Sequence, residues 1–335
     1  MWAGVLAAAL ASVSPANAGD SPPPVLWGVN GHPFSAYPGI APEDQIAEVA
    51  RLGLKSYRVN VTRADQVADL KRLIRIAAER KVTILPILTP PVALADTSAE
   101  DLYRQSKQFA EAVVAPLKGQ VAVWELGNEM ESFAIIHPCE MKDDGTQYNC
   151  KWGPAGGVGA DEYFTPRWRK VSAVLKGLSV GVAGVDPKAR KAMGTAGWGH
   201  LGAFERLRND GVAWDISVWH QYSEDADWAY EKLQAYGKPI WITEFSPPNA
   251  DRPDAEALRP ARLEAMMRKI LKTARKFRIE AAFIYELLDE PYWTDSPEAR
   301  FGLLTMTRSG SAWRIAAPHP SVATVQRITG ETVTP

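Results

Sequence analysis

The feature that most constrains the fold is a regular alternation of short apolar runs with longer amphipathic segments. Each apolar run has the length and the β-branched or aromatic content of a strand, and the stretch that follows has an apolar period near 3.6 residues. We expect strands at residues 27–30, 56–60, 82–88, 121–126, 192–196, 214–219, 240–243 and 280–285. We expect helices at residues 42–52, 64–80, 99–117, 161–178, 202–208, 226–236, 255–277 and 321–328. Such alternation predicts a parallel sheet, either doubly wound or closed into a (β/α)8 barrel.

Two of the expected strands end in a carboxylic acid. The stretch VAVWELGNEME (121–131) runs from apolar residues into Asn128 and Glu129, and PIWITEF (239–245) places Glu244 at the end of a later strand. The carboxyl ends of barrel strands are where (β/α)8 enzymes keep their chemistry. The two acids therefore favour the closed barrel over the doubly wound sheet. A pair of carboxylates is also the machinery of glycoside hydrolysis.

A third strand, WDISVWHQY (214–222), ends in His220 and Tyr222, and the order of these motifs resembles the retaining glycoside hydrolases of clan A. Within that clan the chain is most similar to family 39-like proteins, including periplasmic hydrolases encoded with bacterial exopolysaccharide systems. The segments YELLDEP (285–291) and FGLLT (301–305) support that branch less specifically. The resemblance runs from Trp27 to the C-terminal helix. It implies that Glu129 is the acid/base and Glu244 the nucleophile.

The resemblance also implies roles for neighbouring polar residues. Asn128 is expected to bind a sugar 2-hydroxyl, and Arg58 to lie beside the nucleophile and favour its ionised form. Tyr222 is expected to donate to the nucleophile, and His220 to orient the acid/base or a substrate hydroxyl. An arginine at the barrel rim and a histidine in the core are the plainer alternatives. Glu125, inside its strand, should be buried and should need a cationic or hydrogen-bonding partner.

Aromatic residues are candidates for sugar stacking. The chain has 12 tryptophans, most of which we expect in the core. Trp198 and Trp293 are the expected substrate-binding tryptophans. Tyr285 stands where many clan members have a tryptophan, and we assign it to substrate binding.

Other acids near strand ends are less specific. Glu131 is expected to be an ordinary loop acid. Glu286, Asp289 and Glu290 could bind hydroxyls or a cationic sugar, or could face solvent. Met130 follows the acid/base where proline is common in the clan, which leaves the substrate open.

The N-terminal segment resembles an export signal. Residues 1–18 are apolar and end in Ala16-Asn17-Ala18, the A-x-A pattern that signal peptidase cleaves. We therefore expect cleavage after Ala18, a periplasmic or secreted protein and no stable membrane insertion afterwards, the alternative being an uncleaved anchor. Residues 19–335 are expected to form a single (β/α)8 catalytic domain.

The chain has two cysteines, Cys139 and Cys150, inside one polar loop. An even count confined to one loop of an exported protein predicts a local disulfide. A metal site with His137 is the alternative, but a structural site needs four ligands and the sequence shows no such spacing.

The charge balance and the motifs narrow the function. A net charge of −1 without blocks of like charge argues against nucleic-acid binding. We expect a retaining enzyme that cleaves β-glycosidic bonds in a polysaccharide or oligosaccharide. Cleavage is expected at internal bonds of the sugar chain more than at its end. The expected reaction uses no metal and no organic cofactor. The alternatives are a transglycosylase that uses the same acids and a non-hydrolytic polysaccharide-binding protein of exopolysaccharide assembly.

Overall fold

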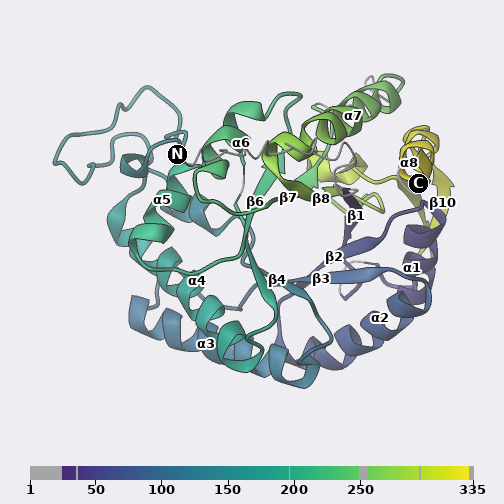
Figure 1. The fold of residues 1–335 in the computed structure, drawn as a ribbon, viewed down its shortest axis with the longest axis horizontal. Coiled ribbons are helices and arrows are strands. Elements are labelled where there is room, and N and C mark those ends of the chain that lie inside the picture. The colour runs from purple at the N-terminus through teal and green to yellow at the C-terminus, as the bar shows by residue number, and fades with distance from the viewer. Residues whose placement is uncertain (1–24, 35–36, 196, 249–255, 294–295, 332–335) are drawn as a thin grey trace, which may run out of the picture.

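The computed structural model describes residues 25–34, 37–195, 197–248, 256–293 and 296–331. Eight parallel strands form a closed barrel in chain order, with β8 paired to β1, and the helices surround this ring (Figure 1). The prediction of a (β/α)8 barrel is confirmed. The strands are β1 (Leu26–Gly31), β2 (Ser56–Val61), β3 (Thr83–Leu88), β4 (Val123–Leu126), β5 (Arg190–Met193), β6 (Ile216–Gln221), β7 (Ile240–Phe245) and β8 (Ile279–Ile284).

The helices bury one face each against the outside of the barrel. In α2 the buried side chains Leu70, Leu73, Ile76 and Ala77 recur at helical spacing. The first turn of α3 is capped by Ser98, whose hydroxyl accepts a hydrogen bond from the Asp101 amide at 3.1 Å. The helices are α1 (Pro42–Arg51), α2 (Val67–Glu79), α3 (Ala99–Val114), α4 (Thr165–Val185), α5 (Gly202–Asn209), α6 (Asp227–Gln234), α7 (Arg259–Phe277) and α8 (Ser321–Glu331).

The barrel interior below the strand ends is a packed core. Its buried side chains come from alternating strand positions: Leu85, Val123, Ala192, Ile216, Val218, Trp241, Ala281 and Phe283. Gly28 makes room for the Phe283 ring, because a Cβ at this position would lie 2.3 Å from a ring carbon. This layer gives the polar groups above it a rigid floor.

Several element boundaries differ from the sequence prediction. Helix α4 begins at Thr165 instead of residue 161, with Pro166 in its first turn, where proline is favoured, and it continues to Val185. Strand β5 ends at Met193, and β6 lies two residues later than expected. Strand pairing determines where these strands end, since β6 continues to Gln221 because Gln221 pairs with Phe245 of β7.

A β-hairpin near the C-terminus was missing from the sequence prediction. Strands β9 (Leu304–Ser309) and β10 (Ala312–Pro318) pair antiparallel outside the barrel. Their alternation of apolar and polar residues is weak, and most of β10 is exposed or half-buried. A period-2 pattern therefore gives little signal here.

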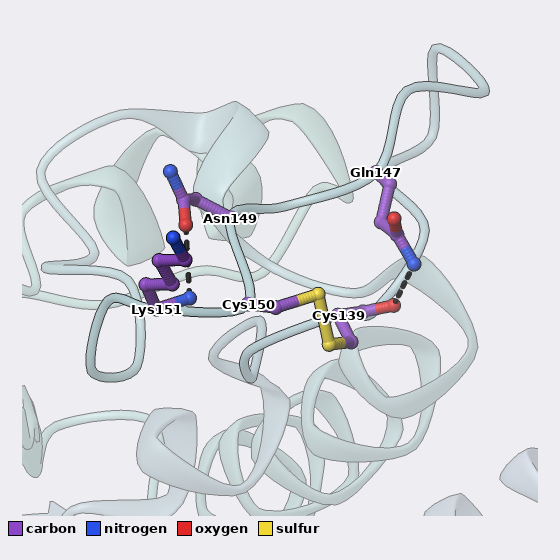
Figure 2. Close-up of a disulfide and its surroundings, with 5 residues drawn as sticks. All are labelled: Cys139, Gln147, Asn149, Cys150 and Lys151. Carbon is purple, nitrogen blue, oxygen red and sulfur yellow. Dashed lines mark hydrogen bonds between the residues drawn. A yellow bond between two sulfur atoms is a disulfide. The ribbon is translucent and has the colours of Figure 1, made fainter.

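The long segment between β4 and α4 contains the expected disulfide, between Cys139 and Cys150. Figure 2 shows this bond together with a hydrogen bond of 3.0 Å from the Gln147 amide to the Cys139 carbonyl. Arg167 of α4 holds Glu140 through both terminal nitrogens, at 2.6 and 2.7 Å. This hydrogen bonding by Arg167 lowers the pKa of Glu140 to about 2. The segment is thus attached to the barrel as well as closed on itself.

The expected signal peptide at residues 1–18 lies outside the described residues. Among the residues that are described, no helix combines the length and the hydropathy that crossing a bilayer requires.

Candidate active site

The two acids singled out from the sequence meet at the carboxyl end of the barrel. A side-chain oxygen of Glu129, a side-chain oxygen of Glu244 and a ring nitrogen of His220 lie within 4.8 Å of one another. Glu129 follows β4, whereas Glu244 and His220 belong to β7 and β6. Closure of the barrel brings together residues that are far apart in the chain.

The backbone turns sharply to present Glu129. Gly127, directly after β4, has a φ of 72°, and a Cβ there would lie 2.8 Å from the sulfur of Met130. Glu129 itself has a φ of 50°, in the left-handed region, and precedes the 3-10 turn η3 (Met130–Ala134). A non-glycine residue in this conformation costs about 1–3 kcal/mol and persists only where its surroundings hold it. The side chain of Glu129 is 38% exposed, so it faces the open mouth of the barrel.

Glu131 is one of the groups that hold this turn. The Thr195 hydroxyl donates to its Oε1 at 2.7 Å, and Nδ1 of His200 lies 3.0 Å from the same oxygen. Glu131 is buried, so the expectation of an ordinary loop acid was wrong. The residues that bind it come from the stretch after β5, which the sequence did not connect with it.

Arg58, on β2, is the centre of the site. Its Nε and Nη2 bind the two oxygens of Glu125 at 2.8 and 2.7 Å. Its Nη1 donates to Glu244 at 2.6 Å and to the Asn30 side-chain oxygen at 2.7 Å. Nη2 also donates to the Asn128 side-chain oxygen at 2.8 Å. The fixed fork of donors on a guanidinium suits this arrangement, in which a lysine could not replace it.

Burial makes these contacts strong and mutually dependent. Arg58, Glu125 and Glu244 are all buried, and the two carboxylates raise the pKa of Arg58 against the opposing effect of its burial. Glu125 thus has the cationic partner that its position in a strand required. A second contact comes from the Thr243 hydroxyl, 3.2 Å from Glu125 Oε1.

Glu244 is held in its ionised form. Burial by itself would raise the pKa of this carboxyl, but the charges of His220 and Arg58 and the hydrogen bonds from Tyr222 and Arg58 lower it below its ordinary value. The Tyr222 hydroxyl donates to Oε2 at 2.6 Å. A buried carboxylate that is ionised and oriented by two donors can act as a nucleophile.

His220 lies between the two acids. Its Nδ1 is 2.8 Å from Glu129 Oε1 and 3.4 Å from Glu244 Oε2. Its Nε2 is 3.2 Å from the Thr243 hydroxyl oxygen. Burial lowers the pKa of His220, but the two carboxylates outweigh this effect and raise it above the usual value. His220 is therefore an ionic partner of both acids as well as a buried residue.

The expected aromatic residues differ in their surroundings. Trp198 is 78% exposed, and Trp293 is also exposed. Tyr285 is buried, with its ring 6.2 Å from that of Tyr222 and 5.7 Å from that of Phe301. Trp198 and Trp293 thus offer open ring faces, whereas Tyr285 forms part of the wall behind Tyr222.

Two further tryptophans are exposed that the sequence did not single out, Trp152 and Trp228. Trp152 follows the disulfide and packs edge-on against Tyr148, with ring centroids 6.0 Å apart. Its position two residues after Cys150, outside any periodic segment, was the available signal. Tryptophans 27, 124, 219 and 241 are buried, as expected for the majority.

Asn30, on β1, is a site residue that the sequence reading missed. Its side-chain nitrogen donates to the carbonyl of Thr243 at 2.9 Å and to that of Ile284 at 3.2 Å, while its oxygen receives Arg58. It therefore connects β1 with β7 and β8. A polar residue at the end of a strand whose other residues are apolar was the signal.

Comparison with known proteins agrees with this geometry. Residues 166–276 match the model of the glycosyl hydrolase catalytic core. This match indicates a glycosidase, whose substrate is a carbohydrate. A search of curated protein sequences finds no match.

Solved structures with a similar fold include β-glucosidases. A family 1 β-glucosidase from Thermotoga maritima has a TM-score of 0.66 at 13% identity, over 93% of this chain and 98% of that chain. A β-glucosidase from the same organism in complex with noeuromycin has a TM-score of 0.68 at 12% identity, over 94% and 99%. The β-glycosidase BGL167 has a TM-score of 0.63 at 14% identity, over 94% and 98%. At these identities the likeness establishes the shared barrel fold.

Proposed function

We propose that this glycosidase is a retaining β-glycosidase that acts by double displacement, with Glu244 as nucleophile and Glu129 as acid/base. The observation that carries the proposal is the distance of at most 4.8 Å between an oxygen of Glu129 and an oxygen of Glu244. Retaining enzymes place their carboxyl groups about 5–5.5 Å apart, whereas inverting enzymes leave about 6.5–9.5 Å for a water molecule.

The surroundings of the acids support these two roles. Glu244 is buried and held ionised by Arg58, His220 and Tyr222, as a nucleophile requires. Glu129 is more exposed, at the mouth of the barrel, where a leaving group departs and water enters. In the first step Glu244 attacks the anomeric carbon while Glu129 protonates the leaving oxygen. In the second step Glu129 removes a proton from the incoming water, which displaces Glu244.

Arg58 and Asn128 orient the sugar in this scheme. The Asn128 oxygen accepts from Arg58, which turns the amide so that its NH2 group can donate to a sugar hydroxyl. The 2-hydroxyl is the group whose hydrogen bonds strengthen in the transition state. The same arginine that holds the nucleophile thus also sets the orientation of a substrate-binding group.

The substrate that we propose is a polysaccharide cleaved within its chain. Exposed indoles at Trp198 and Trp293 offer faces on which successive sugar rings can stack. The resemblance to family 39-like hydrolases of exopolysaccharide systems points to the same substrate class. Comparison of viscosity loss with reducing-end release on exopolysaccharide would separate internal from terminal cleavage.

We also propose that the protein is exported, with cleavage after Ala18. The A-x-A ending of residues 1–18 and the Cys139–Cys150 disulfide support an oxidising compartment. N-terminal sequencing of the exported protein checks this proposal, and a protein that begins at another residue would contradict it.

Azide rescue tests the roles of the two acids. With an activated aryl β-glycoside, Glu129→Ala should form the glycosyl-enzyme and stall, and added azide should then yield the β-glycosyl azide. Glu244→Ala lacks the nucleophile, so azide should enter from the opposite face and yield the α-azide. Without azide, each variant should lose at least about 10⁴-fold in turnover of a polymeric substrate.

The matched control is Asp161→Ala. Its carboxylate is 77% exposed and lies in the segment after β4, outside the pair, so turnover should stay close to that of the unmodified protein. Exchange of the two azide products would reverse the assigned roles. Near-normal turnover in both Glu variants would remove the pair from catalysis.

A further inference from the structure

A second group of one histidine and two glutamates lies at the seam where the barrel closes. His32 follows β1, and Glu286 and Glu290 follow β8. The Nε2 atom of His32 is 3.2 Å from Glu286 Oε2 and 3.7 Å from Glu290 Oε1, and these three groups each place a ligand atom within 4.8 Å of the others. We call these three residues the seam cluster.

The seam cluster is mostly buried, and only its imidazole is partly exposed. The side chain of Glu286 is fully buried and that of Glu290 nearly so, whereas the His32 side chain is 22% exposed. A group that reaches both carboxylates must therefore be small and must enter beside the imidazole. This argues against a sugar hydroxyl or ammonium group as the ligand of Glu286.

The spacing of the three groups fits shared binding of an ion. Nε2 of His32 makes no hydrogen bond within the described part of the chain, although it lies close to Glu286. Two adjacent ligands of one ion at about 2.0–2.2 Å lie about 2.8–3.6 Å from each other in octahedral or tetrahedral geometry. The observed 3.2 and 3.7 Å are close to these values.

Tyr37 gives an independent observation that supports a binding site here. Its side chain is only 5% exposed, and its hydroxyl has no hydrogen-bond partner among the described residues. Its ring lies 6.4 Å from that of His32, and the charges of Glu286 and Glu290 act on the hydroxyl. Leaving a buried hydroxyl without a hydrogen-bond partner is energetically unfavourable. A water molecule bound to an ion in the seam cluster would provide that partner.

We propose that His32, Glu286 and Glu290 bind a divalent transition-metal ion of the Zn²⁺ or Mn²⁺ type. An imidazole with two carboxylates suits these ions, whereas Ca²⁺ and Mg²⁺ prefer oxygen ligands throughout. The ion would add positive charge beside two buried carboxylates, one of which, Glu286, also interacts with the charge of Arg259. This proposed metal site departs from the sequence-based expectation that the protein uses no metal.

The ion would fasten β1 to β8 directly beside the catalytic centre. The Leu287 amide already donates to the Asn30 carbonyl at 3.0 Å across this seam. The Asn30 side-chain oxygen in turn accepts a hydrogen bond from Arg58, which also donates to Glu244. The ion therefore stabilises the closed seam at the point where Asn30 reaches the arginine.

Zn²⁺ binding to the exported, EDTA-treated protein tests the proposal without any sugar present. Equilibrium dialysis with metal analysis should show one Zn²⁺ per chain, and Zn²⁺ should raise the unfolding temperature. His32→Ala should weaken the affinity at least about tenfold. Glu290→Gln serves as a second variant, and circular dichroism shows whether each variant is folded.

Two matched controls locate the ion. Glu129→Gln alters the other cluster of one histidine and two glutamates, and His319→Ala alters a histidine that contacts Glu256 and Asp289 at 2.7 and 2.8 Å. Both should bind Zn²⁺ within about twofold of the unmodified protein, because neither supplies a ligand to the seam cluster. Absence of binding of both Zn²⁺ and Mn²⁺ by the unmodified protein would overturn the proposal. Undiminished affinity in folded His32→Ala and Glu290→Gln, or loss of binding in Glu129→Gln, would also overturn it.

Discussion

Two clusters of one histidine and two glutamates lie on the same end of the barrel, and they achieve charge balance differently. The cluster that we propose as catalytic, Glu129, His220 and Glu244, includes a carboxylate that accepts hydrogen bonds from a buried arginine and from a tyrosine hydroxyl. In the seam cluster an imidazole lies beside two carboxylates, and the Tyr292 hydroxyl donates to Glu290 at 2.5 Å. Arg58 is thus hydrogen-bonded to a carboxylate of the first cluster, whereas the seam cluster has the spacing that we propose for an ion from solution.

The role that we propose for Glu244 as nucleophile explains this difference. A nucleophile must be ionised yet open to the substrate, so its positive partners must lie behind it and stay there. Arg58 fulfils this condition because Glu125 fixes it from the other side through two hydrogen bonds. The seam cluster has no such requirement, since Glu286 is closed to a sugar.

The largest effect in this comparison is expected from Arg58→Met. Removing the guanidinium leaves Glu125 and Glu244 as buried charges, so the free energy of unfolding should fall by about 3–5 kcal/mol. The value of kcat/KM should fall by about 10²–10³-fold or more, because Glu244, the proposed nucleophile, loses its orientation and charge balance. Urea unfolding and steady-state kinetics measure the two effects.

Two variants sharpen the prediction for Arg58. Arg58→Lys keeps the charge without the fork of donors, so its loss should be intermediate. His32→Ala in metal-free protein should cost far less stability than Arg58→Met, because its side chain is partly exposed. An Arg58→Met protein as stable as the unmodified one would contradict the central place given to the arginine.

A smaller effect is expected from Tyr222→Phe. The variant removes one hydrogen bond to an ionised carboxylate, which corresponds to about a tenfold or greater loss in kcat/KM. The pKa of Glu244 should rise, because this hydrogen bond lowers it. The acid limb of the pH profile of kcat/KM should therefore move to higher pH.

Tyr230→Phe is the matched control for Tyr222→Phe. It also removes a buried hydroxyl, but one that donates to Gln221. It should lower stability while kcat/KM stays within about twofold and the acid limb does not move. An unchanged acid limb in Tyr222→Phe would separate Tyr222 from the ionisation of Glu244.

The smallest expected effect is a shift in the titration of His220. Although burial lowers its pKa, the negative charges of Glu244 and Glu129 raise the value above 6.5. A raised pKa in the folded state adds stability that is fully present below the unfolded value and is lost as pH rises through the folded value. Glu244→Gln removes the stronger of these charges, so the pKa should fall and this loss of stability should become smaller. Side-chain NMR titration measures the pKa, and an equal value in both proteins would contradict the coupling.

The site residues that the sequence predicted are those recognisable within one continuous stretch of sequence. Glu129 and Glu244 each end an apolar run; Asn128 belongs to the segment of Glu129, and His220 and Tyr222 end a third apolar run. Their environments agree with the expected roles, since Tyr222 donates to Glu244 and His220 contacts Glu129. Their catalytic and binding roles remain predictions.

The residues that were missed depend on partners from other strands. Asn30 binds β7 and β8 carbonyls, and Glu131 binds Thr195 and His200. The hairpin β9–β10 was missed for another reason, because its half-exposed strands lack a clear alternation. Residue type alone does not distinguish such buried polar groups from solvated ones.

The sequence by itself determined the alternation of strands and helices, the acids at two strand ends and the disulfide loop. These features depend on neighbouring residues, whose periodicity and spacing are visible in a linear chain. The resemblance placed Arg58 beside Glu244, but only the tertiary structure decided that Arg58 also contacts Glu125 and Asn128. Only the tertiary structure decided that His32 lies beside Glu286 and Glu290. Those side-chain contacts depend on the register of the eight strands and on the pairing of β1 with β8. Interactions between segments that are distant in the sequence determine both.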